Sequence, residues 1–291
     1  MCKTLHKHSS SFPNTTLQTL KLSSSFFLLF LLLHISLSQS SPHLFIYGGC
    51  SQPKYQPNSP FQSNLNNLLS SLSNSASQSS YNSLATGNDS STPPDAAVYG
   101  LYQCRGDLST ADCASCVQSA VAQLGLVCVY AYAAGLQLDG CFVRYDNVNF
   151  LNRLDTTLMY KKCSPSTSND DEFFRKRDDV LADMQSGVGF RVRSVGTVEG
   201  VSQCMGDLSS SDCSACLSEA VSQLKNVCGS ALAADVYLAQ CYARYWASGY
   251  YSSADSSNED DVGRTVSIIV GVLAGVAVVI VFLSFLRKAF A

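Results

Sequence analysis

Cysteines are the residues of this chain whose type and spacing could do chemistry. Residues 104–116 read CRGDLSTADCASC and residues 204–216 read CMGDLSSSDCSAC, so the spacing C-x8-C-x2-C occurs twice. A C-x2-C pair can bind zinc, cycle between thiol and disulfide, or belong to a structural disulfide framework. The cellular compartment favours one of these chemistries over the others, and two apolar segments predict that compartment.

The N-terminal segment predicts secretion. The apolar run FFLLFLLLHISLS at 26–38 follows a polar leader that carries lysines. This run is short for a membrane span and ends in small residues, so residues 1–38 are predicted to be a signal peptide that is cleaved near Ser38. Retention of the segment as an anchor is the alternative.

The C-terminal segment predicts a membrane span. Residues 265–286 form an uncharged apolar run, which as a helix rising about 1.5 Å per residue would cross roughly 30 Å of hydrocarbon. A linker at 251–264 precedes it, and Arg287 and Lys288 open a tail at 287–291. The positive-inside rule places that tail in the cytosol, which makes the chain a single-pass type I protein.

Two glycines within the span, Gly271 and Gly275, have the spacing that lets two membrane helices approach closely. They could therefore pack a pair of such helices. Chance occurrence in a run rich in Gly, Ala and Val is the alternative.

The cysteine count is even in the mature protein. Of 13 cysteines, Cys2 leaves with the signal peptide, and the other 12 lie on the oxidising side of the membrane. Disulfides persist in that environment, so an even count favours complete pairing. The formal net charge of −3 and the absence of a basic stripe argue against nucleic-acid binding.

The chain contains a duplication. Residues 103–145 align with 203–245 without a gap and share 22 identities in 43 positions, including five cysteines in each block. One further cysteine, Cys50 or Cys163, lies upstream of each block. The twelve cysteines therefore divide into six and six, and we predict two domains of one type at 43–152 and 157–250.

Each copy is predicted to have an α+β fold. Ser109 and Asp112 resemble a capping box, and Cys113, Cys116, Ala120 and Leu124 follow on one helical face. The remaining expectations are helices at 61–77 and 171–185, strand-forming segments at 136–147 and 236–246, a serine-rich loop at 73–94, and a second unit that opens at 164–171. The second copy is shorter between its first two cysteines, so its front half could be abbreviated.

Structural disulfides are the favoured chemistry of these cysteines. Each domain offers only one C-x2-C, and His43 is the one histidine left after signal removal, which argues against zinc. A redox pair Cys113–Cys116 at a helix start is geometrically allowed, but no neighbouring base or lysine would lower a thiol pKa. Six cysteines permit 15 pairings, and their spacing alone does not select one.

Conventional catalysis finds little support, because almost no histidine is available for a Ser-His-Asp or Cys-His arrangement. Four carboxylates recur between the copies and could be imagined as glycosidase pairs: Asp107, Asp112, Asp207 and Asp212. Helix capping explains Asp112 and Asp212 more simply, and Asp107 is expected to order the GDLS turn. We therefore expect no enzyme and no cofactor.

Several other motifs have a structural interpretation beside a functional one. The RGD at 105–107 resembles an adhesion tripeptide, but the second copy has MGD. The RKR at 175–177 is predicted to be a solvated helix face. The repeated Arg-Tyr, Arg144-Tyr145 and Arg244-Tyr245, is predicted to pack and to form a buried hydrogen bond. Packing is likewise favoured over sugar stacking for three aromatic residues: Trp246, Tyr250 and Tyr251.

One N-glycosylation sequon remains in the mature chain, at Asn88, within the predicted serine-rich loop. A surface loop is the environment that such a modification requires.

The C-x8-C-x2-C core, with GDLS, DC, AV and CxxRY around it, resembles the plant cysteine-rich ginkbilobin-type (stress-antifungal) domain. Two tandem copies, one membrane span and a tiny tail are similar to the plasmodesmata-located protein family. This resemblance covers roughly residues 43–286. It implies two helices on a five-stranded antiparallel sheet in each copy.

The resemblance also implies a disulfide pairing and a position for a sugar site. The implied bridges are Cys50–Cys128, Cys104–Cys113, Cys116–Cys141, Cys163–Cys228, Cys204–Cys213 and Cys216–Cys241. Single-domain antifungal relatives bind mannose through an Asn, an Arg and a Glu. The corresponding positions here are Ser51, Gly135 and Asp146 in the first copy and Ser164, Asp235 and Trp246 in the second. Only Asp146 is similar, so we do not carry that site over.

By the same resemblance we expect a plasma-membrane protein at plasmodesmata, with extracellular domains, that regulates cell-to-cell trafficking through callose deposition and acts in plant defence. The expected partners are the membrane, homo- or hetero-oligomers with related membrane proteins, viral movement proteins and a cell-wall glycan. A carbohydrate- or peptide-binding receptor is the first alternative, and an extracellular thiol oxidoreductase is the second.

Overall fold

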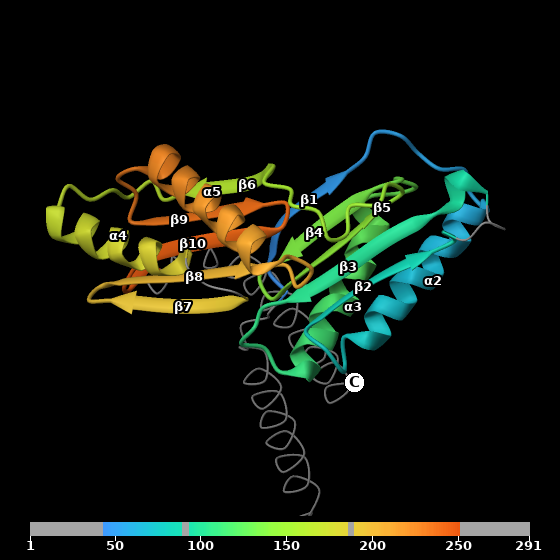
Figure 1. Ribbon diagram of the computed structural model, residues 1–291, viewed down its shortest axis with the longest axis horizontal. Coiled ribbons are helices and arrows are strands. Elements are labelled where there is room, and N and C mark those ends of the chain that lie inside the picture. The colour runs from blue at the N-terminus through green and yellow to red at the C-terminus, as the bar shows by residue number, and fades with distance from the viewer. Residues whose placement is uncertain (1–42, 89–92, 186–188, 251–291) are drawn as a thin grey trace, which may run out of the picture. The chain divides into compact units, whose positions relative to one another are not determined.

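Each repeat forms a five-stranded antiparallel sheet with two helices on one face. The computed structural model in Figure 1 describes residues 43–88, 93–185 and 189–250. Both repeats belong to one unit that begins at His43. The α+β class and the helix and strand content expected from the sequence are confirmed for the part of the chain that the structure describes.

The first sheet has the strand order β1-β4-β5-β3-β2, and the second has the equivalent order β6-β9-β10-β8-β7. The elements of the first repeat are β1 Phe45–Cys50, α2 Pro60–Ser75, β2 Tyr81–Thr86, the 3-10 turn η1 Pro94–Ala96, β3 Val98–Cys104, α3 Thr110–Val127, β4 Ala134–Leu138 and β5 Cys141–Asp146. Those of the second are β6 Leu158–Cys163, α4 Asp171–Gln185, β7 Phe190–Val195, β8 Val198–Cys204, α5 Ser210–Cys228, β9 Ala233–Leu238 and β10 Cys241–Ala247.

The strand register repeats with the same offset of 100 residues as the sequence. Cys104 pairs with Cys141 across β3 and β5, and Cys204 pairs with Cys241 across β8 and β10. The duplication in the sequence is therefore a duplication of the whole sheet.

Helix α3 shows why the sequence folds this way locally. Ser109 is its N-cap and accepts a hydrogen bond from the Asp112 amide at 3.2 Å, which satisfies one of the donors that a helix start leaves open. The residues expected on one face are all buried: Cys113, Cys116, Ala120 and Leu124. That face packs on the sheet beside α2 and forms the core of the first repeat (Figure 1).

One expectation about the strands needs correction, and another is confirmed with added detail. The segment at 73–94 is not all loop, because Tyr81–Thr86 forms the edge strand β2 against β3. Its polar residues hide the strand pattern, since an edge strand needs little burial. The segments at 136–147 and 236–246 each contain parts of two strands. Residues 139–140 and 239–240 separate those strands.

The front half of the second repeat keeps every strand and α-helix of the first and lacks only the 3-10 turn η1, among the described residues. The shortening lies in connections, chiefly between the second and third strands of each sheet. There the first repeat has eleven residues, 87–97, and the second has two, 196–197. Connections tolerate such changes because they lie outside the hydrogen-bonded ladder.

Candidate functional site

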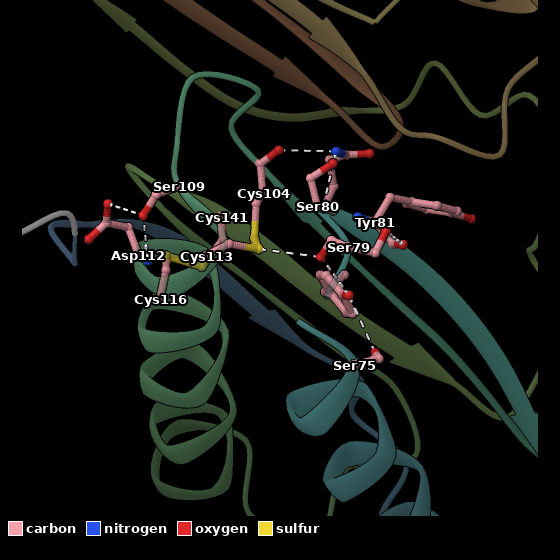
Figure 2. Close-up of a disulfide and its surroundings, with 12 residues drawn as sticks. Ser75, Ser79, Ser80, Tyr81, Cys104, Ser109, Asp112, Cys113, Cys116 and Cys141 are labelled. Carbon is pink, nitrogen blue, oxygen red and sulfur yellow. Dashed lines mark hydrogen bonds between the residues drawn. A yellow bond between two sulfur atoms is a disulfide. The ribbon is translucent and has the colours of Figure 1, made fainter. Parts of the chain in front are cut away.

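The two cysteines of each C-x2-C pair join the helix that carries them to its sheet through two disulfides. Cys113 is bonded to Cys104 at the end of β3, and Cys116 is bonded to Cys141 at the start of β5 (Figure 2). The second repeat has the same two bonds, Cys204–Cys213 and Cys216–Cys241. Cys50–Cys128 and Cys163–Cys228 complete the set. These are the six pairs that the family resemblance implies.

The pairing bears directly on metal and redox chemistry. Cys113 and Cys116 are bonded to different partners rather than to each other, whereas a dithiol–disulfide couple would need them joined. All twelve described cysteines are in disulfides, so their sulfurs are not thiolate ligands. The arrangement is a covalent framework that joins helix to sheet.

The four repeated aspartates have structural contacts. Ser109 donates a hydrogen bond to Asp112 at 2.6 Å (Figure 2), and Ser209 does the same to Asp212 at 2.7 Å. Asp107 pairs with Arg105, and Asp207 accepts a hydrogen bond from the backbone amide of Asn152 at 2.9 Å. The last contact joins the segment between the repeats to the second repeat.

The RGD tripeptide is held by contacts within the chain. Arg105 donates to Asp107 at 2.7 Å and to Asp139 at 2.5 Å. Although burial opposes its charge, these two carboxylates raise the pKa of Arg105. The arginine orders the turn between β4 and β5, in agreement with the structural interpretation.

The repeated Arg-Tyr pair forms the predicted buried hydrogen bond in both copies. The hydroxyls of Tyr145 and Tyr245 donate to the carbonyls of Ala131 and Ala231, each at 3.0 Å. Burial raises the pKa of both tyrosines. The two arginines differ: Arg144 lies over the ring of Phe150 at 4.0 Å, while Arg244 pairs with Asp235 at 2.7 Å.

The prediction of a solvated RKR segment is partly wrong. Arg175 is exposed, but Arg177 is buried in the fold with 8% of its surface accessible. Its guanidinium donates to the Gly229 carbonyl and pairs with Asp178 at 2.9 Å. One turn of α4 thereby anchors the end of α5, which the charge pattern alone did not indicate.

The positions that correspond to a sugar site are occupied by contacts of the fold. Ser51 accepts a hydrogen bond from the Ala133 amide at 3.0 Å and donates to the Pro53 carbonyl. Gly135 pairs with Arg144 across β4 and β5, and Asp146 lies 3.6 Å from that arginine.

The second copy differs again at those positions. Ser164 is buried, Asp235 is paired with Arg244, and Trp246 is half-buried on β10. The structure thus brings these residues near one another in each sheet, but the side chains differ between the two copies. Tyr250 ends the described region, and Tyr251 lies outside it.

A cluster of aromatic residues joins the two repeats and was missed from the sequence. Four of its members are aromatic and two, Leu101 and Met205, are not. They lie in strands of both sheets or, for Met205, directly after β8: Tyr47, Leu101, Phe142, Met205, Tyr237 and Tyr242. Tyr47 stacks on Tyr160 of the second repeat with ring centroids 5.7 Å apart. The signal was present in CFV at 141–143 and CYA at 241–243, because a strand covered on both faces reads as a continuous apolar run.

Two glycines lie where the repeats meet, and their contacts are reciprocal. A Cβ atom on Gly106 of the first repeat would overlap Phe190 of the second, and a Cβ on Gly206 would lie 2.6 Å from the Tyr81 ring of the first. Phe190 and Tyr81 both begin the last edge strand of their sheets. Side chains at these glycines would therefore clash with the other repeat.

Polar contacts accompany the aromatic cluster. Gln103 and Gln203, at equivalent positions, both donate to the Cys104 carbonyl, at 3.0 and 2.9 Å. Tyr242 donates to the Gln203 side chain at 3.2 Å. A cavity of about 10 Å³ beside them has room for a water-sized molecule and is far smaller than a sugar-binding pocket.

Asn88, the glycosylation candidate, is exposed immediately after β2. The signal peptide at 1–38, the linker at 251–264, the span at 265–286 with Gly271 and Gly275, and the tail at 287–291 lie outside the described residues. Within the described ranges, none of the helices has the length and apolar character of a membrane span.

Comparison with known proteins places these features in a family. A model of the "Salt stress response/antifungal" family matches residues 49–148 and 162–248. Plasmodesmata-located protein 8 of Arabidopsis thaliana is 57% identical over 250 residues, which cover 84% of this chain and 90% of that protein. Plasmodesmata-located protein 6 of the same plant is 46% identical over 262 residues, with 86% and 90% covered.

A solved structure is similar as well. The crystal structure of the tandem DUF26 ectodomain of the Arabidopsis cysteine-rich receptor-like protein PDLP8 matches with a TM-score of 0.68 and 58% identity. The match covers 71% of this chain and 100% of that one. With two matched domains and relatives of this identity, the chain belongs to the plasmodesmata-located protein family.

Proposed function

We propose that this chain is a non-enzymatic type I plasma-membrane protein of plasmodesmata that regulates the movement of molecules between cells. The observation that carries the proposal is the 57% identity to plasmodesmata-located protein 8 across 84% of the chain. Residues 1–38 direct secretion, 265–286 span the membrane, and the two repeats face the cell exterior.

The route of regulation that we propose is local callose deposition, brought about by protein partners. The two repeats carry twelve cysteines in disulfides and a packed seam, which suits a rigid binding or assembly module. In this proposal a signal toward the cytosol passes through partners of the span, for which Gly271 and Gly275 offer a packing surface.

The partners included in this proposal are homo- or hetero-oligomers with related membrane proteins, viral movement proteins and a cell-wall glycan. We place protein partners first, because the sugar-site positions Ser51 and Asp235 are already engaged within the fold.

Imaging of the full chain with a fluorescent tag on its cytosolic end, beside a callose stain, tests the location. The expected result is punctate signal that coincides with callose at the cell boundary. A matched variant with a stop after residue 250 should be secreted and lose the puncta. A uniform cell-surface or intracellular signal from the full chain would overturn the proposal.

Movement of a small cytosolic fluorescent protein between neighbouring cells tests the activity. Raising or removing the chain should change both the number of cells reached and the callose stain, and an inhibitor of callose synthesis should abolish the change. Unaltered movement at both expression extremes would contradict the proposed regulation.

A further inference from the structure

The helical layers of the two repeats have the same fold but very different charge. Helices α2 and α3 together contain one charged residue, Asp112, whereas α4 contains eight and α5 contains three. The exposed side of α2 consists of uncharged polar residues, among them Asn66, Asn67 and Ser70. Because the second repeat keeps this fold with eleven charges, the neutrality of the first layer is not a requirement of folding.

An apolar surface lies at the end of this neutral layer, and we call it the α3 tip. Its members are Leu126 at 80% exposure, Val127 at 54%, Val129 at 48% and Tyr130 at 42%. The second repeat has Asn226, Val227, Gly229 and Ser230 in these places. Three of the four positions are thus polar or glycine in the copy, so the fold does not need them apolar.

Tyr130 adds an independent observation. Its φ angle is +58°, a left-handed conformation that a bulky residue rarely adopts. Its carbonyl accepts a hydrogen bond from the Tyr55 amide at 2.8 Å, and its ring meets the Tyr55 ring edge-on. Residues in strained conformations persist where surrounding contacts hold them, and they cluster at binding sites and switch regions. The Cys50–Cys128 disulfide lies within the same segment and holds it rigid.

Gly125 provides a second independent observation about the α3 tip. It lies inside α3, where glycine is among the least favourable residues, and a Cβ atom built on it would meet nothing within 4 Å. The second repeat has Lys225 there. Among the described residues no neighbour leaves too little room for a side chain at this position, whereas close approach by the backbone of another molecule would favour glycine.

We propose that the α3 tip, together with the neutral face of α2 and α3, is a self-association surface on which a second copy of this chain docks. In a two-fold pair each residue near the axis faces its own copy, so a charge there meets a like charge. A charge-free surface is the one that tolerates such pairing. The cores of protein interfaces contain few charged residues and many apolar and aromatic ones, and a side chain that is already held rigid loses less entropy on binding. The α3 tip has these properties.

The α3 tip is the surface through which the homo-oligomer of the proposed function would form. The choice of a second copy as partner rests on that proposed function. The location at plasmodesmata is scored separately by the callose stain. Loss of the plasmodesmal location would therefore leave the pairing of copies as a separate result.

The test uses two differently tagged full-length chains expressed together, with energy transfer between the tags as the readout. The variant Gly125→Lys/Leu126→Asn/Val129→Gly/Tyr130→Ser carries the residues that the second repeat has at the equivalent positions. We expect it to lower self-association at least tenfold. The control Val148→Gln/Val192→Gln removes two valines that are equally exposed, at 62% and 63%, outside the helical layer, and should have no effect.

Two further variants separate the other contributions. Gly125→Ala should raise the Tm by about 2–4 °C, because alanine favours the helix, while it weakens self-association. Gly271→Leu/Gly275→Leu tests the membrane span. Loss of pairing in the span variant alone, equal loss in the valine control, or absence of pairing in the unaltered chain would overturn the proposal. Binding of a neutral β-glucan that depends on the α3 tip, without self-association, would overturn it too.

Discussion

Arg244 of the second repeat donates a hydrogen bond to Asp139 of the first, with 3.1 Å between guanidinium Nη1 and carboxylate Oδ1. Asp139 also accepts from Arg105, and Arg244 also donates to Asp235. The side chains of Arg244 and Asp139 are 15% and 29% exposed, so water screens the pair only in part. This chain of charges links the two sheets at their seam.

Asp139→Asn should lower the free energy of unfolding by about 1–2 kcal/mol, because two charge-assisted hydrogen bonds weaken while each arginine keeps one carboxylate. Asparagine is, like aspartate, a common turn residue, so the substitution is compatible with the turn at 139–140. Asp183→Asn is the matched control: its ion pairs are longer, at 3.6 and 3.9 Å, and more exposed, so its loss should cost less than about 0.5 kcal/mol. Denaturant titration of both variants measures the difference, and equal effects would contradict the assignment.

Gly206→Ala should destabilise the protein by about 1–3 kcal/mol, since the new methyl group would overlap the Tyr81 ring of the other repeat. Adding Tyr81→Ala should recover part of this loss, because it removes the overlapping ring. Gly49→Ala, whose added methyl group meets nothing within 4 Å, should be close to neutral. Thermal unfolding of the unaltered chain, Gly206→Ala, Tyr81→Ala and the double variant gives the coupling energy between positions 206 and 81. Additive losses from Gly206→Ala and Tyr81→Ala would show that the two residues do not meet.

Alkaline pH should weaken the fold. Burial raises the pKa of Tyr47, Tyr237 and Tyr242 above the usual value of about 10. The unfolded chain therefore releases these protons first as pH rises. Stability is fully present below about pH 10 and falls above it as the unfolded tyrosines ionise.

Denaturation midpoints measured from pH 8 to pH 11 test this expectation. Tyr242→Phe removes one titrating group, so its midpoint should fall less steeply at high pH even though the variant loses the hydrogen bond to Gln203 at neutral pH. Equal slopes for both proteins would refute the contribution of Tyr242.

The disulfides should differ in their contribution to stability according to loop length. Cys50–Cys128 closes a loop between residues that are 78 positions apart in sequence, and Cys104–Cys113 closes a loop between residues that are 9 positions apart. The chain-entropy model predicts losses of about 4.5 and about 2.7 kcal/mol when each pair is replaced by alanines. Urea unfolding of the two double variants measures the order. A larger loss from the short loop would indicate that the folded-state contacts of Cys104 and Cys113 matter more than loop entropy.

The amino-acid sequence by itself determined the duplication, the six-and-six division of the cysteines and the helices at Pro60–Ser75, Thr110–Val127 and Asp171–Gln185. These features are local. A cap such as Ser109 and a periodic apolar face act within a few turns of chain, so their pattern is visible in one dimension. The edge strand Tyr81–Thr86 was missed for the same reason, because its pairing with β3 is not a local property.

Only the tertiary structure decided how the repeats meet and which surface remains open. Asp139 and Arg244 lie 105 residues apart in sequence, and Gly106 and Phe190 are also distant from each other in the chain. Their contacts follow from the packing of two sheets rather than from any periodicity. Likewise, the sequence alone allowed both Leu126 and Arg177 to be either buried or exposed. The packing exposes the leucine and buries the arginine, since a helix covers its sheet with one face and leaves the other to solvent or to a partner.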